Sequence, residues 1–329
     1  MIRIFLNRKE KEQVEDLLLA DLRRAKKGPW KQLKKKVNRK FIENGYPEVA
    51  KELYDNGEVN EDNLKKLLLA DRKTMKEYIK KFSPDFDWND KNRKKVLEND
   101  LKQWKEIFNF ERYGARKAAR NILTIMRVDV CPYCNRIFTA VSPKSGTRPP
   151  LDHYYPKSRY PYLALTLYNL IPCCDICNRK KSKLDTAKKG NEILYPYEEE
   201  MGKDVVFRFE AEEDFVKVFQ GASDKLEIKF TVEHKNKNTP KIQKQIEALS
   251  LEEIYQAHRG YVKDILRVNY IYNTKVVESI KKQFPEILKT DDDVKALMYM
   301  KRIEKEFWGT RPLAKLTHDI DEQLKELKS

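Results

Sequence analysis

Apolar residues recur at the spacing of α-helices through most of the first 125 residues. Two leucine groups show the pattern most clearly, because each would gather on one face of an amphipathic helix. They are Leu17, Leu18, Leu19 and Leu22, and Leu64, Leu67, Leu68 and Leu69. Turn residues near 29, 47 and 83–85 separate the helical stretches. A further helix is expected over 112–127, where the chain leads toward its first pair of cysteines.

The pattern changes to that of strands between residues 203 and 232. The segments 205–209, 215–219 and 226–230 are apolar or alternate apolar with polar residues, and turn residues separate them. They predict a small antiparallel sheet. Helical spacing returns from Thr239, which with the following proline predicts a helix start, and 320–329 predicts a charged closing helix. Ser250 and the glutamate three residues later fit a capping box.

These patterns divide the chain into four expected regions. They are a basic helical region over 1–127, a compact cysteine-containing core over 128–190, a small antiparallel β segment over 191–238 and a helical region over 239–329. Of the 329 residues, 40% are hydrophobic and 36% charged, which is enough apolar content for a sizeable core. The predicted fold class is α+β, a mostly helical chain with a central core and a small antiparallel sheet after it.

The charge balance favours an anionic partner. Lys and Arg number 68 against 52 Asp and Glu, giving a net charge of +16 and excluding a strongly acidic protein. The excess is densest over 131–190, which holds 11 basic residues, three aspartates and no glutamate. A second basic cluster runs from Arg23 to Lys40, and it either follows phosphates or is the solvated face of a helix.

Nothing in the sequence predicts a membrane protein. The longest uncharged stretch, 160–174, is interrupted by Pro161 and Pro172, so it cannot form a spanning helix. The first residues lack the apolar run of a signal peptide. We therefore expect a cytoplasmic protein without a membrane partner.

All five cysteines lie between residues 131 and 177, in a pattern that favours a metal site. Two C-x-x-C pairs, Cys131 with Cys134 and Cys174 with Cys177, present four sulfurs, as in a structural zinc centre. An odd, clustered set argues against a disulfide framework. Buried or redox-active thiols are the alternative. Cys173 has apolar neighbours and is expected in the core rather than at the metal.

Between the two cysteine pairs lies a group of residues suited to phosphodiester hydrolysis. The string runs C-x2-C, D-H-x-x-P-K-S, N-L and C-x2-C-N-x-x-K, and its polar members are Asp152, His153, Lys157, Asn169, Asn178 and Lys181. Histidine titrates near neutrality and can act as a general base. A carboxylate and an amide are oxygen ligands appropriate for Mg²⁺ or Mn²⁺. In this order the string resembles the HNH endonucleases in their zinc-knuckled form, over about 131–182 only.

The resemblance implies an architecture and a role for each residue. The fold would be a ββα-metal core, with strands near 137–142 and 150–154 and a helix from about 175. His153 would be the general base, Asp152 and Asn178 the ligands of a catalytic Mg²⁺ or Mn²⁺, and Asn169 the residue that pins the loop. An asparagine at 178, where the family has His or Asn, makes this an H-N-N variant. The four paired cysteines would hold structural zinc, and DNA phosphates would meet Lys157, Arg179, Lys180 and Lys181.

Several functions are compatible with this motif and its helical flanks. The first is a DNA endonuclease whose helical flanks resemble nuclease subunits of bacterial anti-phage systems such as Septu, which often act beside an ATPase. Because the sequence holds no G-x-x-x-x-G-K-[ST] loop, an ATPase would be a separate chain. A homing or restriction nuclease and a zinc-containing nucleic-acid-binding module without catalysis are the alternatives. His234, His258 and His318 are expected to be ordinary surface or core residues.

Overall fold

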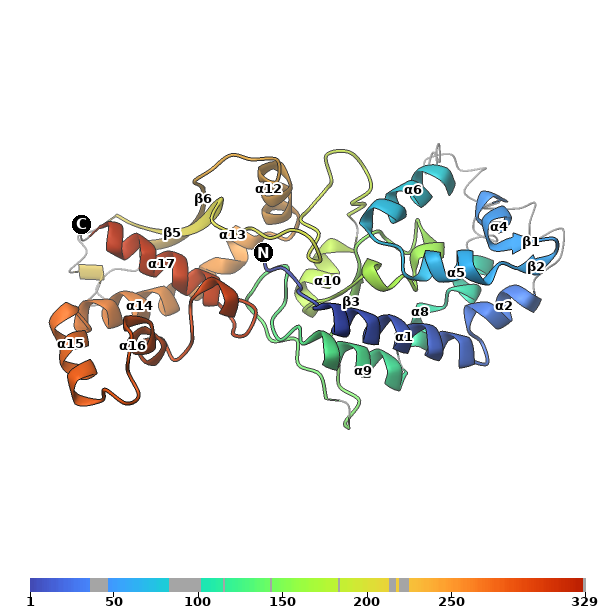
Figure 1. The fold of residues 1–329 in the computed structure, drawn as a ribbon. Helices are drawn as coiled ribbons and strands as arrows, with labels where there is room; N and C mark the ends of the chain where they lie inside the picture. The colour runs from blue at the N-terminus through green and yellow to red at the C-terminus, as the bar shows by residue number, and fades with distance from the viewer. Residues whose placement is uncertain are drawn as a thin grey trace. The chain divides into compact units, whose positions relative to one another are not determined.

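The computed structural model describes residues 1–35, 47–82, 102–114, 116–142, 144–182, 184–212, 217–218 and 225–327. They form two compact units. The N-terminal unit consists of Ile4–Arg127 and Ala140–Glu192, and the C-terminal unit of Met1–Arg3, Val128–Thr139 and Ile193–Ser329. Helices predominate in both, and the described strands pair as small two-stranded antiparallel sheets (Figure 1). The predicted α+β class is confirmed.

The N-terminal unit is built mainly of short helices. Its helices are α1 (Arg8–Arg24), α2 (Pro29–Lys35), α4 (Pro47–Leu53), α5 (Glu61–Leu68), α6 (Arg72–Phe82), α8 (Phe110–Gly114), α9 (Lys117–Met126) and α10 (Asp175–Lys181). Its strands are β1 (Tyr54–Asp55), β2 (Glu58–Val59), β3 (Leu151–His153) and β4 (Leu170–Pro172), and two 3₁₀ turns cover Pro161–Leu163 and Leu167–Asn169. The helix expected over 112–127 is therefore two helices, α8 and α9.

Helix α1 shows how the local sequence shapes this unit. It begins with a capping box, in which the Asn7 side chain accepts a hydrogen bond from the Glu10 amide and the Glu10 carboxylate accepts one from the Asn7 amide. Its buried stripe is Val14, Leu18 and Leu22, one residue every four. Leu17 and Leu19, expected on the same face, are partly exposed. Helix α9 lies beside α1 (Figure 1).

The basic cluster from Arg23 to Lys40 is only partly within the described residues, because 36–40 lie outside them. In α2, Trp30 and Leu33 are buried. Lys31, Lys34 and Lys35 are exposed beside them. In the described part, the cluster is thus the solvated side of a short amphipathic helix, and the phosphate-binding alternative stays a prediction.

The strand pair that carries Asp152 and His153 differs from the expectation. Strand β3 pairs antiparallel with β4, with Asp152 opposite Ile171 and His153 opposite Leu170. The expected pairing of 137–142 with 150–154 is wrong, since Phe138 and Ser142 form only isolated bridges to Val130 and Thr147. Apolar Leu170 and Ile171 are the buried partners that the sequence offers to β3. Helix α10 begins at Asp175, as predicted.

The C-terminal unit combines one longer strand pair with helices. Strands β5 (Val205–Ala211) and β6 (Leu226–Val232) pair antiparallel, from Val205 opposite Val232 to Ala211 opposite Leu226. The helices are α12 (Thr239–Ala248), α13 (Leu251–Tyr255), α14 (Arg259–Ile271), α15 (Thr274–Gln283), α16 (Asp291–Met298) and α17 (Ala314–Glu326), with 3₁₀ turns over Gln256–His258 and Lys305–Phe307. The two-stranded sheet and the helix start at Thr239 are as predicted.

Two details of this unit correct the sequence interpretation. Of the third expected strand, 215–219, only residues 217–218 are described, and their backbone is helical. Ser250 precedes α13 in a left-handed conformation, with φ 50°, and its side chain makes no capping hydrogen bond, so the expected capping box is wrong. A capping residue ordinarily has an extended backbone, and the left-handed backbone of Ser250 departs from it.

The interior of the C-terminal unit forms where α17 covers β5. Phe207, Phe209 and Ile228 are buried from the strands, and Leu316 and Ile320 from the helix. The Asp319 carboxylate accepts a hydrogen bond from the Phe207 amide at 2.9 Å, and the Gln323 side chain exchanges two hydrogen bonds with the backbone of Phe209. Side chains of α17 thereby occupy the edge of β5 that no strand pairs.

Candidate metal centre and active-site pocket

Four of the five cysteines lie close together. One sulfur from each of Cys131, Cys134, Cys174 and Cys177 lies within 4.8 Å of the others, and all four residues are buried. None of the five cysteines forms a disulfide. Four such sulfurs match the donor set of tetrahedral zinc, so this cluster can hold a metal ion such as zinc.

The first cysteine pair is held by a buried asparagine. Asn135 directly follows Cys134 and adopts a left-handed conformation, with φ 53°, which asparagine tolerates better than most residues. Its side chain donates to the Trp308 carbonyl at 2.7 Å and accepts from the Lys315 amide at 3.1 Å, while its backbone oxygen accepts from Leu313. These bonds fix the turn that carries Cys131 and Cys134 to the start of α17.

The second cysteine pair forms the start of α10. Cys174 is the N-cap residue, and its sulfur accepts a weak hydrogen bond from the Cys177 amide at 3.5 Å. Cys173 is fully buried and does not belong to the cluster of four, as expected. Burial raises the pKa of the Cys173 thiol, which keeps it neutral and unsuited to bind a metal.

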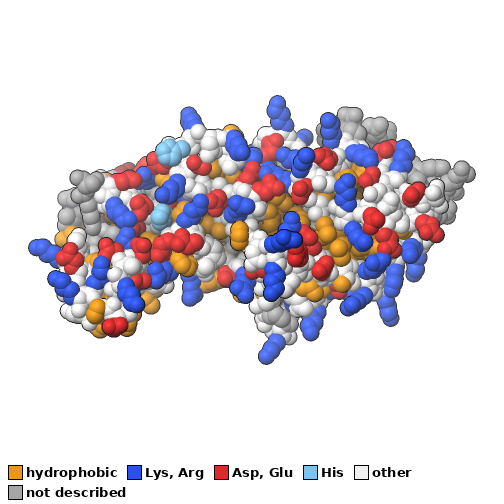
Figure 2. Space-filling view, viewed as in Figure 1, with side chains coloured by type: hydrophobic (Ala, Val, Ile, Leu, Met, Phe, Trp, Pro, Cys, Tyr) orange, Lys and Arg blue, Asp and Glu red, His pale blue; other side chains and the backbone are white. Residues whose placement is uncertain are grey.

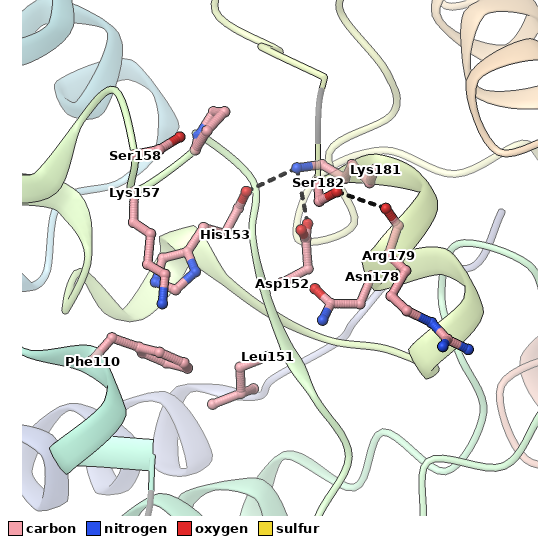
Figure 3. A pocket seen from close by; sticks show the side chains of 11 residues that line it. Phe110, Leu151, Asp152, His153, Lys157, Ser158, Asn178, Arg179, Lys181 and Ser182 are labelled. Carbon is pink, nitrogen blue, oxygen red and sulfur yellow. Dashed lines mark hydrogen bonds and ion pairs between the residues drawn. The ribbon is translucent and has the colours of Figure 1, made fainter.

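A cavity of about 400 Å³ opens beside β3 and α10, within the N-terminal unit (Figure 3). Asp152 and His153 reach it from β3 and Asn178 from α10. The remaining lining residues are Phe110, Leu151, Pro156, Lys157, Ser158, Arg179, Lys181 and Ser182. The structure therefore brings Asp152, His153 and Asn178 to one pocket, together with three of the four basic residues expected to meet DNA.

His153 is buried and held in one ring orientation. Its Nε2 lies 3.1 Å from the Ala164 carbonyl, and the Phe110 ring packs edge-on against the imidazole at 4.5 Å between centroids. A carbonyl can only accept, so Nε2 carries the proton and Nδ1 of the neutral ring is free of one. Burial, and next the positive charge of Lys157, lower the pKa of His153 to about 3. The ring is thus neutral at physiological pH, with Nδ1 available to accept a hydrogen bond.

Asn169 ties the segment after His153 to the turn before β4. Its side-chain oxygen accepts from the Tyr155 amide at 2.7 Å, and its amide group donates to the carbonyls of Tyr155 and Leu163. Its backbone oxygen accepts from the Tyr154 amide at 2.8 Å. The side chain is fully buried and is not among the residues that line the pocket, and its hydrogen bonds hold the backbone that follows His153.

Lys181 lies where the resemblance would place a phosphate-binding group, but its side chain is turned inward. It is 1% exposed, and its ammonium lies 3.0 Å from the Asp152 carboxylate. It also donates to the carbonyls of His153 and Tyr154, at 2.8 and 3.0 Å. An ammonium has three hydrogens, and these acceptors use all of them.

The other three basic residues expected to contact DNA phosphates lie in different positions relative to the pocket. Lys157 is at the pocket, where its ammonium forms an ion pair with Glu111 and lies 4.8 Å from the centre of the Phe110 ring. Arg179 lines the pocket from the exposed side of α10. Lys180 is exposed on the same helix but does not line the pocket.

Sequence reasoning missed the contribution of α8. Phe110 forms a wall of the pocket and contacts the His153 ring, and Glu111 pairs with Lys157. Both residues lie outside the motif region, in a stretch that reads only as helix. No feature of that stretch distinguishes a pocket wall from an ordinary helical residue, because the contact depends on tertiary packing.

On the face shown in Figure 2, Lys and Arg side chains are spread among Asp and Glu rather than gathered in one field. Within the part of the chain that the structure describes, no helix is long and apolar enough to cross a membrane. Comparison with family models, curated proteins and solved structures finds no match for this chain.

Proposed function

We propose that this chain is a metal-dependent endonuclease of the HNH class that hydrolyses phosphodiester bonds of DNA. The observation that carries the proposal is the convergence of His153, Asp152 and Asn178 on one pocket. An isolated histidine or aspartate has many structural uses, but a neutral imidazole beside a carboxylate and an amide is the set that metal-assisted hydrolysis needs. The basic side chains of Lys157 and Arg179 at the same pocket suit a phosphodiester substrate.

In this proposal His153 removes a proton from the attacking water. Nδ1 is the accepting nitrogen, because Nε2 already donates to the Ala164 carbonyl. Phe110 limits rotation of the ring from one side. Asn169 holds the segment that follows His153, so it is a positioning residue rather than one that touches the substrate.

The side chains also fit the expected metals. Asp152 and Asn178 offer a carboxylate oxygen and an amide oxygen at the pocket, the hard donors that Mg²⁺ and Mn²⁺ prefer over softer ions. Such a cation would stabilise the charge that develops on the phosphoryl and leaving oxygens. The four clustered cysteines would hold zinc in a structural role.

The proposal extends to a biological setting. The resemblance of the motif and its large helical flanks to nuclease subunits of anti-phage systems favours a defence effector that acts with a separate ATPase. Only the resemblance of the motif supports this part of the proposal, because likeness at the level of the fold does not define function. Addition of a candidate ATPase to the cleavage reaction, with and without ATP, tests it.

The deciding experiment is cleavage of supercoiled plasmid and of linear single-stranded DNA, with Mg²⁺ and then Mn²⁺. We expect the unmodified protein to cut and His153→Ala to lose at least about 100-fold in rate, the usual contribution of a general base. His234→Ala is the matched control, because His234 is exposed and outside the pocket. DNA affinity, measured by fluorescence anisotropy, should be equal in all three proteins.

Two outcomes contradict the proposal. Cleavage that survives in His153→Ala at the full rate would mean that another group, or a contaminating nuclease, performs it. Zinc-dependent DNA binding without cleavage in any condition, including with the partner ATPase, would favour a nucleic-acid-binding module instead.

A further inference from the structure

The pair formed by Asp152 and Lys181 is the feature of the pocket that the proposed function leaves unexplained. The two side chains are 5% and 1% exposed, and 3.0 Å separates the carboxylate from the ammonium. Both residues line the cavity (Figure 3). A buried lysine costs free energy unless its charge and its hydrogens are satisfied. An apolar side chain would fill this place at a lower cost in free energy, so packing alone does not explain the lysine.

The contacts of Lys181 show what its ammonium does. Besides the carboxylate, it binds the carbonyls of two consecutive residues, His153 and Tyr154. One charged group on α10 therefore fixes both the Asp152 side chain and the backbone at the end of β3. The Thr186 hydroxyl also donates to the Tyr154 carbonyl, so that carbonyl is held from a second direction without Lys181.

We propose that Lys181 is a positioning residue and the built-in counter-cation of Asp152, which it shares with any divalent cation that enters the pocket. The inference rests on the proposed function, because it takes Asp152 as a ligand of that cation. The ammonium balances the charge of the buried Asp152 carboxylate and holds it in place at 3.0 Å. When a divalent cation binds the same carboxylate, the ammonium stays close enough to repel it.

The arrangement has a measurable consequence for metal affinity. Two like charges held close together oppose each other, and even with the strong screening of water the repulsion of a divalent ion by a neighbouring ammonium is equivalent to about tenfold in affinity. Removal of the Lys181 charge should therefore tighten metal binding. It should also leave the buried Asp152 carboxylate without its counter-cation, so that the metal-free protein becomes less stable and gains more from added metal.

The test is Mn²⁺ binding, measured by electron paramagnetic resonance on the full chain without nucleic acid. We expect Lys181→Met to bind Mn²⁺ about tenfold more tightly than the unmodified protein. Asp152→Asn defines the signal of this site, because binding that persists in it belongs elsewhere. Lys188→Met is the matched control, since Lys188 is exposed and outside the pocket, and its affinity should equal that of the unmodified protein.

A second readout and a second variant protect the test against misfolding. The rise in thermal midpoint on addition of Mn²⁺ should be larger for Lys181→Met than for the unmodified protein. Lys181→Gln keeps donors for the carbonyls of His153 and Tyr154 but removes the charge, so it replaces Lys181→Met if that variant does not fold. The same increase in affinity is expected from it.

The outcomes separate this inference from the proposed function. Equal or weaker Mn²⁺ binding by the folded Lys181 variants, with normal binding by the unmodified protein, overturns the inference and leaves the nuclease proposal intact. Absence of Mn²⁺ binding in every protein overturns the inference and the assignment of Asp152 as a ligand together. Failure of the nuclease proposal alone appears as Mn²⁺ binding that follows the expected order without any cleavage that depends on His153.

Discussion

Two parts of this molecule combine the same elements, a two-stranded antiparallel sheet and a helix with a fully buried lysine, and they reach different results. In the N-terminal unit, β3 and β4 with α10 carry Lys181, which pairs with Asp152 on the strand. In the C-terminal unit, β5 and β6 with α17 carry Lys315, which pairs with Asp319 four residues along the same helix at 2.7 Å. The first pair lines a cavity, whereas the second is part of a core.

The surroundings of the two lysines explain the difference. The Lys315 ammonium lies 4.8 Å from the centre of the Trp308 ring, and the Asp319 carboxylate also accepts a hydrogen bond from the Phe207 amide. These contacts belong to the packing of α17 on β5. In the N-terminal unit, Asp152 on β3 and Lys181 on α10 are also buried, but both line an open cavity. A buried ion pair is therefore not by itself a sign of function, and access to a cavity separates the two cases.

If the cysteine cluster holds zinc, as we propose, loss of the zinc should produce the largest contrast between the two parts. The N-cap of α10 is a member of the cysteine cluster, whereas β5 and β6 contain none. Structural zinc contributes on the order of 10 kcal/mol of apparent binding free energy in small domains. After chelation, hydrogen exchange should accelerate strongly in α10 and much less in β5, as followed by mass spectrometry of the two peptides.

The matched variants for that prediction are Cys177→Ser and Cys173→Ser. Metal analysis should find zinc lost from the first and retained in the second, because only Cys177 belongs to the cluster. The prediction is contradicted if the purified protein holds no zinc. It is also contradicted if chelation leaves the hydrogen-exchange rate of α10 unchanged.

Removal of the core lysine should have the next largest effect. Lys315→Met leaves Asp319 buried without its partner, which typically costs about 3–5 kcal/mol in the free energy of unfolding. Lys305→Met breaks only an exposed ion pair with Glu200 and should cost less than about 1 kcal/mol. Urea unfolding measures both. A Lys315→Met protein as stable as the unmodified one would show that the core pair is replaceable by apolar packing.

The smallest expected effect is a pH dependence of the C-terminal unit. Burial lowers the pKa of His318, which lies on α17 with its ring 5.2 Å from that of Trp308. The unfolded chain then binds a proton at a higher pH than the folded one, so stability is complete above the ordinary histidine pKa of about 6.5 and falls as pH decreases below it. The slope of unfolding free energy between pH 7 and 5 should decrease in His318→Gln. An unchanged slope would assign the dependence to other groups.

The sequence predicted the parts of this fold whose cause is local. The alternation over 205–209 and 226–230 marked β5 and β6, and the resemblance of the motif implied a helix from about 175, where α10 begins. The C-x-x-C pairs indicated four cysteines that the structure indeed brings together. Each of these signals is short-range or carried by an unusual residue type.

The predictions that were wrong concern features that depend on contacts between residues far apart in the sequence. The partner of β3 is β4, which lies after a loop of two 3₁₀ turns, and no pattern in 137–142 excluded that segment as the alternative. Lys181 reads as one more basic residue of a charged helix, and only its burial against Asp152 distinguishes it from Lys180. The burial of a side chain and the pairing of distant strands depend on the complete tertiary fold, so the neighbouring residues in the sequence do not reveal them.

The contribution of α8 has a practical consequence for anyone who trims this chain. A fragment limited to 128–190, the stretch that the motif marks, would contain His153 but not Phe110, and the imidazole would lose the ring that packs against it. Glu111, the ion-pair partner of Lys157, would be absent as well. The shortest expression fragment with a complete pocket therefore begins upstream of Phe110, and comparisons between natural variants should align that helix together with the motif.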